Sequence, residues 1–159
     1  MHSPLIDNLN RRGTSVMAKP LILLVEDDPF DVLAMKRCVA AFDLPVQLEQ
    51  AGDGEEALVA LARLMAQPNP PEVMVLLDLN MPRMNGIELL DAMRADLKLA
   101  RTIVFVLSTS RDPRDRRAAY ARGVAGYICK DSVAPDYADL ATLIRAYVDL
   151  VTLPEPAQP

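Results

Sequence analysis

The chain has 159 residues, of which 51% are hydrophobic, and its 17 Lys and Arg against 22 Asp and Glu give a formal net charge of −5. This length and apolar fraction predict one domain with a substantial core and exclude a disordered or collagen-like chain. The acidic balance argues against a nucleic-acid partner, because such binding depends on clustered cations. Two cysteines and one histidine are too few for a disulfide framework or a Cys/His zinc site, and we expect a reducing, cytoplasmic setting.

The N-terminal residues do not resemble a secretory signal, because they lack an apolar stretch of sufficient length. The longest apolar runs also fall far short of the roughly 20 residues that a membrane-crossing helix needs, so we predict no membrane partner. We expect residues 1–18 to be a mobile extension, residues 19–151 to form the folded domain and residues 152–159 to be a proline-rich tail.

Short, continuously apolar runs recur along the chain, at residues 21–25, 73–77, 103–107 and 127–129. A run that is apolar at every position predicts a strand buried on both faces, as in parallel sheets covered by helices. Residues 46–50 alternate between apolar and polar side chains, which predicts an edge strand with one solvated face.

Helix starts are predicted by a repeated capping pattern, in which an Asx residue stands three positions before an acid. The pattern occurs at Asp28, Asp53, Asn85 and Asp112. A capped N–H group and a negative charge at the positive end of the helix dipole both favour a helix start. Four helices are therefore predicted to begin near residues 29, 54, 86 and 113, and a fifth near Pro135.

This alternation of strands and helices predicts an α/β fold, a flavodoxin-like, doubly wound, five-stranded parallel sheet with five helices. Two edge-like strands, the second and the fifth, favour the strand order 2-1-3-4-5. In that order strands 1 and 3 are neighbours at the switch point, where ligands bind at the carboxyl ends of the strands.

Acidic residues stand at those carboxyl ends. The first predicted strand runs into Glu26, Asp27 and Asp28, and the third runs into Asp78. Pro29 follows Asp28, which is therefore expected to be a helix cap. The remaining carboxylates would repel one another in a cleft, so a divalent cation or a lysine is required. Magnesium is the expected ion, because the available ligands are oxygens.

Two further residues follow the last two strands. Ser108 stands directly after the fourth predicted strand, and Lys130 directly after the fifth. A carboxylate nucleophile, a metal pair, a hydroxyl and a lysine around one point are the groups needed to accept and hold a phosphoryl group.

Four motifs in this order, LLVEDD, LLDLNMPRMNG, VLSTS and GYICKD, resemble those of the response-regulator receiver domain of two-component signalling. The resemblance covers residues 21–150 and implies that Asp78 accepts a phosphoryl group. It further implies that Glu26, Asp27 and Asp78 bind Mg²⁺ together with the backbone carbonyl of Asn80. Such a domain is not a dedicated enzyme but catalyses its own phosphorylation and dephosphorylation.

The resemblance also assigns residues to the phosphate and to the switch. Lys130 would pair with the phosphate, Ser108 would be the switch hydroxyl with Thr109 beside it, and Tyr127 would be the aromatic side chain that reports the position of the hydroxyl. Asp131 departs from the family pattern, which has a proline after a cis peptide bond at this position. A non-proline cis bond costs about 2.5 to 4 kcal/mol, so either the loop bears that strain or Lys130 precedes a trans bond.

Three alternative functions compete with this interpretation. An aspartyl-phosphate phosphatase of the haloacid dehalogenase kind needs a second aspartate two residues after its nucleophile, where this chain has Asn80. A flavin-binding flavodoxin-like module needs a phosphate loop after the first strand, where the acidic sequence EDDP would repel a phosphate. A pseudo-receiver that never takes phosphate is the third alternative, and the Asp78, Ser108 and Lys130 set argues against it.

The expected partner is a sensor histidine kinase or a phosphotransfer protein, because the single histidine lies outside the predicted domain. The sequence VDLVTLP near the end is similar to the small regulators paired with bacterial phytochromes, which makes a phytochrome-type kinase a candidate. No output domain is expected, so the readout would be a protein contact. We expect a homodimer through the face of the fourth helix, fifth strand and fifth helix, with Leu150 and Leu153 available to a partner.

Overall fold

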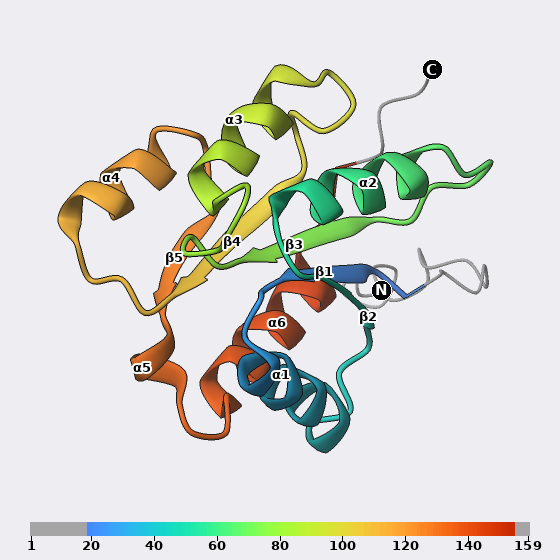
Figure 1. Ribbon diagram of the computed structural model, residues 1–159. Coiled ribbons are helices and arrows are strands. Elements are labelled where there is room, and N and C mark those ends of the chain that lie inside the picture. Colours follow the sequence, from blue (N-terminus) through green and yellow to red (C-terminus); the bar gives the residue numbers. More distant parts are fainter. Residues whose placement is uncertain (1–18, 155–159) are drawn as a thin grey trace, which may run out of the picture.

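The computed structural model describes residues 19–154 (Figure 1). The predicted N-terminal extension and residues 155–159 of the predicted tail lie outside the described residues. Within residues 19–154, no helix combines the length and the apolar character that crossing a membrane requires. The elements follow in the order β1 (Leu21–Val25), α1 (Pro29–Ala41), β2 (Gln47–Ala51), α2 (Gly54–Met65), β3 (Val73–Leu77), α3 (Gly86–Ala95), β4 (Ile103–Ser108), α4 (Pro113–Tyr120), β5 (Gly126–Cys129), α5 (Lys130–Val133) and α6 (Ala138–Leu150).

The five strands form one parallel sheet in the order β2-β1-β3-β4-β5, which confirms the predicted fold class and strand order. The bounds of β1 and β3 are those predicted, while β2 begins and ends one residue later and β5 begins one residue earlier. β4 ends one residue later than predicted, so Ser108 is the last residue of the strand rather than the first after it. β1 and β3 pair in register, with Val25 opposite Leu77. The residues that follow these two strands therefore emerge side by side.

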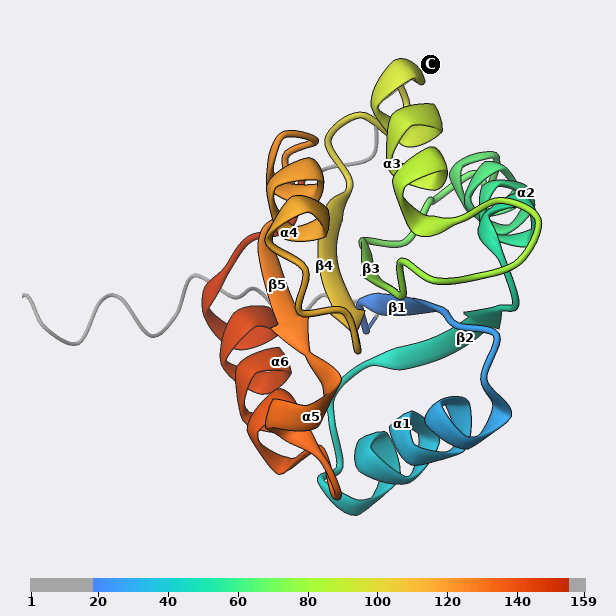
Figure 2. The same cartoon turned by 60° about the vertical axis from the view of Figure 1, so that its left-hand side comes forward.

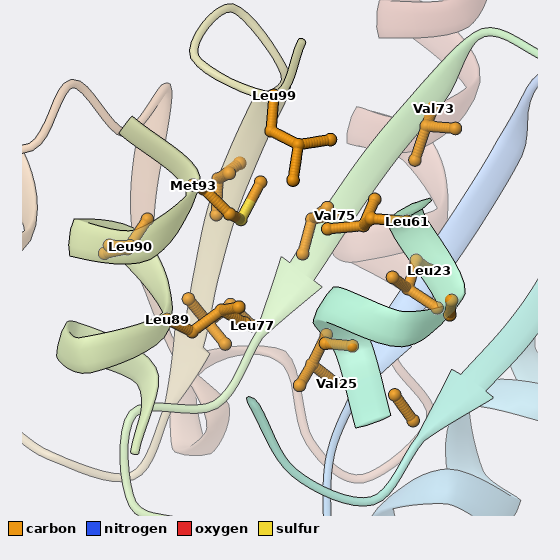
Figure 3. Packing of buried hydrophobic residues seen from close by; sticks show 14 of the residues in the cluster. Leu23, Val25, Leu61, Val73, Val75, Leu77, Leu89, Leu90, Met93 and Leu99 are labelled. Carbon is orange, nitrogen blue, oxygen red and sulfur yellow. The ribbon is translucent and has the colours of Figure 1, made fainter. Parts of the chain in front are cut away.

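Helices cover both faces of the sheet, with α2, α3 and α4 on one side and α1, α5 and α6 on the other (Figures 1 and 2). Successive strand residues point to opposite faces. Leu23, Val25 and Val75 pack with Leu61 of α2 and Leu89 of α3 on the first side, as Figure 3 shows. Both faces of the central strands are thus buried, as their continuously apolar sequences predict.

The other face packs against α1 and α6. Ile22 and Leu24 of β1 lie in a cluster with Met35 of α1 and Ile144 of α6. Leu153 joins this cluster and is only 3% exposed, so its predicted availability to a partner is wrong. After α6 the chain continues in an extended conformation, which returns Leu153 to the core. The apolar stripe of the helix does not predict this burial, because Leu153 lies beyond the end of the helix.

The predicted caps are present. The side chains of Asp28, Asp53, Asn85 and Asp112 each accept a hydrogen bond from a backbone N–H in the first turn of their helix. Asn85 forms a full capping box, because Glu88 also accepts from the Asn85 N–H. The four helices consequently begin at the predicted residues.

The number of helices differs from the prediction, since residues 19–154 form six rather than five. Lys130–Val133 closes one helical turn directly after β5, and the last helix begins at Ala138, three residues after Pro135. A residue before proline is disfavoured in a helix, which separates the two segments. Among the described residues the cis peptide bond is Ala134–Pro135, so Lys130–Asp131 is trans.

Candidate functional site

Three carboxylates meet where β1 and β3 end. Glu26 and Asp27 follow β1, Asp78 follows β3, and the Asp78 N–H donates to the carbonyl of Val25 at 3.0 Å. One carboxylate oxygen from each of the three acids lies within 4.8 Å of the other two. The register of the sheet therefore places acids that are far apart in sequence next to one another in one cluster.

The three acids differ in their surroundings. Glu26 and Asp78 are buried, at 2% and 7% exposure, whereas Asp27 is exposed. Glu26 Oε1 accepts from the Asp28 N–H at 3.0 Å, and Asp78 Oδ1 accepts from the Asn80 N–H at 3.2 Å. Each buried carboxylate thus has one oxygen held by the backbone, and the cluster opens to solvent on the side of Asp27.

Lys130 supplies the cation beside these acids. Its Nζ lies 2.5 Å from Glu26 Oε2, 2.7 Å from Asp31 Oδ2 and 3.4 Å from Asp78 Oδ2. The lysine is buried, at 6% exposure, so these contacts are only weakly screened by water. The structure therefore brings Lys130 to Asp78 as expected, but its two shorter contacts are with Glu26 and Asp31.

Burial sets the ionisation of the site. Burial is the largest influence on Glu26 and raises its pKa from 4.5 to about 7, although the hydrogen bonds from Lys130 and Asp28 favour the charged form. For Lys130, burial by itself would lower the pKa. The hydrogen bonds to Asp31 and Glu26 and the nearby charge of Asp78 outweigh burial and raise the Lys130 pKa above 10.5.

The acidic cluster fits a hard divalent cation. It offers only oxygen donors, and Mg²⁺ is held by one or two carboxylates with several waters, at oxygen distances near 2.0–2.1 Å. Oxygens within 4.8 Å of one another can close on such an ion through small side-chain rotations. Because Asp27 is exposed, the ion would keep access to water and to a substrate.

The predicted switch residues lie along β4 and β5. Ser108 is fully buried at the end of β4, and its Oγ accepts from the Ser110 N–H at 3.2 Å, while Thr109 is exposed. The hydroxyl of Tyr127 donates to the carbonyl of Ser110 at 3.0 Å. Ser108 and Tyr127 are therefore joined through one residue of the β4–α4 loop.

The loop that follows Asp78 is held by two further contacts. The Gly86 N–H donates to the carbonyl of Leu79 at 3.0 Å, and a Cβ at Gly86 would lie 2.6 Å from the Asp78 carbonyl oxygen. Asp53, the cap of α2, is 1% exposed and forms an ion pair with Arg83 of the same loop. These contacts restrain the backbone on which Asp78 is carried.

The sequence pattern predicts Asp31 only as the acid in the first turn of α1, and no motif singles out Tyr137. The structure places both beside Lys130, with the Tyr137 hydroxyl 3.5 Å from Asp31 Oδ1. Burial and the Asp31 charge raise the pKa of Tyr137 to about 12. Because α1 begins at the carboxyl edge of the sheet, the sequence does indicate that Asp31 lies near the site. Whether the Asp31 side chain faces Lys130 depends on how α1 packs against the sheet.

Comparison with known proteins identifies the family. The response regulator receiver domain matches residues 22–143 of the chain. The chain belongs to this family. A receiver is a module of two-component signalling, and the phosphatase and flavodoxin-like alternatives are not favoured.

Relatives and solved structures agree with this assignment. The receiver is 31% identical over 136 residues to response regulator Rcp1 of Synechocystis sp., covering 84% of this chain and 92% of that protein. It is 36% identical over 116 residues to the nitrate/nitrite response regulator NarL of Escherichia coli, covering 72% of this chain but spanning only about half, 50%, of NarL. The crystal structure of the phosphorylated cyanobacterial phytochrome response regulator RcpA is similar, with a TM-score of 0.71, 30% identity, and coverage of 87% of this chain and 100% of that one.

Proposed function

We propose that this receiver accepts a phosphoryl group from a histidine kinase onto Asp78. In this step a bond forms between an Asp78 carboxylate oxygen and phosphorus while the P–N bond of the phosphohistidine breaks. The electron pair of that bond returns to the imidazole nitrogen of the donor. The observation that carries the proposal is the position of Asp78, which shares one acidic cluster with Glu26 and Asp27 and lies 3.4 Å from the amine of Lys130.

Mg²⁺ is the proposed cofactor, held by Glu26, Asp27, Asp78 and the backbone carbonyl of Asn80. It would neutralise charge that develops on the transferring phosphoryl oxygens. The oxygen-only cluster supports this assignment. A solved structure of the Mn²⁺-bound form of Rcp1, 30% identical with a TM-score of 0.65, supports a divalent metal in a similar protein.

The phosphoryl group would be held by residues at the ends of β4 and β5. Lys130 would pair with one phosphoryl oxygen, and the Ser108 hydroxyl, with Thr109 beside it, would bond to another. A movement of Ser108 would break the hydrogen bond that its Oγ accepts from the Ser110 N–H. The carbonyl of Ser110 in turn accepts a hydrogen bond from the Tyr127 hydroxyl. This chain of contacts is a route from phosphorylation to the face formed by α4, β5 and α6.

The proposed partners are a cytoplasmic sensor histidine kinase and a second copy of the receiver. A phytochrome-type kinase is supported by the similarity to RcpA and to the solved structure of RPA3017, a response regulator in red light signalling of R. palustris. The dimer face would comprise α4, β5 and α6, where Tyr120, Leu143 and Leu150 are exposed at 51%, 40% and 84%. We propose no nucleic-acid contact for this domain.

Labelling by a small-molecule phosphodonor tests the proposed phosphorylation site. Acetyl phosphate should label the wild type in the presence of Mg²⁺ and should not do so in excess EDTA. Asp78→Asn should abolish the label without loss of the fold, checked by circular dichroism. Asp96→Asn, at the exposed C-terminal end of α3, is the matched control and should retain the label. Label that persists in Asp78→Asn would refute the site assignment.

The proposed dimer has its own test. Light scattering with and without beryllofluoride, a phosphoryl mimic, should show a dimer at micromolar concentration, and Leu150→Arg should convert it to a monomer. Val59→Arg is the control, because Val59 is 70% exposed on α2, away from the proposed face. A monomeric wild type under both conditions would contradict the dimer.

A further inference from the structure

The amine of Lys130 has three hydrogen-bond donors, and carboxylates occupy all three. Its contacts are 2.5 Å to Glu26, 2.7 Å to Asp31 and 3.4 Å to Asp78. The longest of these contacts is the one to the proposed phosphoryl acceptor. A phosphoryl oxygen can therefore accept a hydrogen bond from Lys130 only when one of the three carboxylates loses its hydrogen bond to the amine.

Asp31 differs from the other two partners in its place and in its exposure. Glu26 and Asp78 belong to the acidic cluster proposed to hold the metal, and Asp31 does not. The side chain of Asp31 is 30% exposed, against 2% for Glu26 and 9% for Asp78. If the lysine leaves Asp31, water can solvate this carboxylate. Loss of the ion pair therefore costs less free energy at Asp31 than at either buried acid.

The position of Asp31 is held by the start of α1 and by α6. Asp31 lies in the first turn of α1, three residues after the cap Asp28, whose own N–H is bonded to Glu26. Its second carboxylate oxygen lies 3.5 Å from the hydroxyl of Tyr137, at the N-terminus of α6. α1 and α5, which carries Lys130, lie on the same side of the sheet (Figures 1 and 2). The start of α1 and Tyr137 thus hold the Asp31 carboxylate beside Lys130.

We propose that Asp31 is a positioning residue that competes with the phosphoryl group for Lys130. While Asp78 is unmodified, Asp31 holds the amine on the α1 side of the site. When Asp78 carries a phosphoryl group, which brings a charge of about −1.5 to −2 in place of one carboxylate charge, the amine leaves Asp31 for a phosphoryl oxygen. Asp31 thereby raises the donor concentration that phosphorylation requires. This inference rests on the proposed function of the site.

The test measures the rate of Asp78 labelling against acetyl phosphate concentration at saturating Mg²⁺. In this reaction the P–O bond of acetyl phosphate breaks, acetate leaves with the electron pair, and phosphorus bonds to Asp78. An ion pair to a partly exposed acid contributes at most about 1 kcal/mol, which corresponds to about fivefold. Asp31→Asn should lower the half-saturating concentration by up to about fivefold, with little change in the maximal rate.

Two variants control for charge and for position. Asp31→Glu keeps the negative charge and should behave as the wild type. Asp139→Asn neutralises an exposed acid in the first turn of α6 and should also leave the concentration dependence unchanged. Beryllofluoride titration of the same variants should show the same order of half-saturating concentrations, because it measures phosphoryl-site binding without bond transfer.

The outcomes distinguish the inference from the function on which it rests. If the wild type takes no label, the proposed function fails. If the wild type and Asp139→Asn are labelled, and Asp31→Asn needs as much donor as the wild type or more, the competition is refuted while the proposed function stands. Asp31→Glu behaving like Asp31→Asn would also refute it, because the effect would then not follow the charge. Circular dichroism confirms that each variant retains the native fold before it is compared.

Discussion

Replacement of Lys130 by methionine keeps an unbranched side chain of similar length and removes the amine from three carboxylates. The Lys130 side chain is 8% exposed and that of the closest acid, Glu26, is 2% exposed, with 2.5 Å between Nζ and Oε2. Removal of one partner from a buried ion pair typically costs about 3–5 kcal/mol, because the other charge remains buried without compensation. We expect Lys130→Met to lower the free energy of unfolding by about 3 kcal/mol in the absence of divalent metal.

A double-mutant cycle separates the contribution of Glu26 from that of the other partners. In a Glu26→Gln background the most buried of the three carboxylates around Lys130 is neutral, so Lys130→Met should cost only about 1 kcal/mol, and the coupling energy should be about 2 kcal/mol. Because the chain has no tryptophan, urea unfolding followed by far-UV circular dichroism in EDTA is the suitable assay.

Additivity of the two substitutions to within about 0.5 kcal/mol would refute the reasoning, since it would mean that the amine and the Glu26 carboxylate do not interact. Magnesium provides a second check. A cation that binds the folded state stabilises it by mass action, and it neutralises the same carboxylates as the lysine. Added Mg²⁺ should therefore raise the stability of Lys130→Met more than that of the wild type.

Three further substitutions probe the frame around the site. The added Cβ of Gly86→Ala would lie 2.6 Å from the Asp78 carbonyl oxygen. This substitution should therefore destabilise the fold by about 1–3 kcal/mol, measured by calorimetry, and slow the phosphoryl labelling of Asp78. The guanidinium of Arg94 donates to four backbone carbonyls, so Arg94→Lys, with a compact amine, should lower urea stability by about 2 kcal/mol. A change under 0.5 kcal/mol would contradict that role. A backbone N–H in the first turn of α2 and the Arg83 guanidinium lower the pKa of Asp53 below 3.8. The stabilisation that the charged Asp53 gives to the fold is therefore present above about pH 3.8 and is lost as the pH falls through the folded-state pKa. Asp53→Asn should accordingly be less stable than the wild type at neutral pH but not in strong acid.

Much of the fold followed from patterns that are local in the chain. The strands β1 and β3 are apolar at every residue because both of their faces are buried, and each of the caps at Asp28, Asp53, Asn85 and Asp112 satisfies N–H groups only two or three residues away. Such interactions are complete within a short segment, so the sequence determined the strands and the helix starts, and the two edge-like strands favoured the observed strand order.

Tertiary packing decided which charges face one another. Lys130 is separated from Glu26 by 104 residues and from Asp31 by 99. Which carboxylates the amine contacts depends on how far α1 is rotated about its own axis against the sheet. The burial of Leu153 and the separate turn of α5 likewise depend on contacts with distant segments. Helix rotation and chain reversal are set by the whole core, because many small packing contacts outweigh the preference of any one residue.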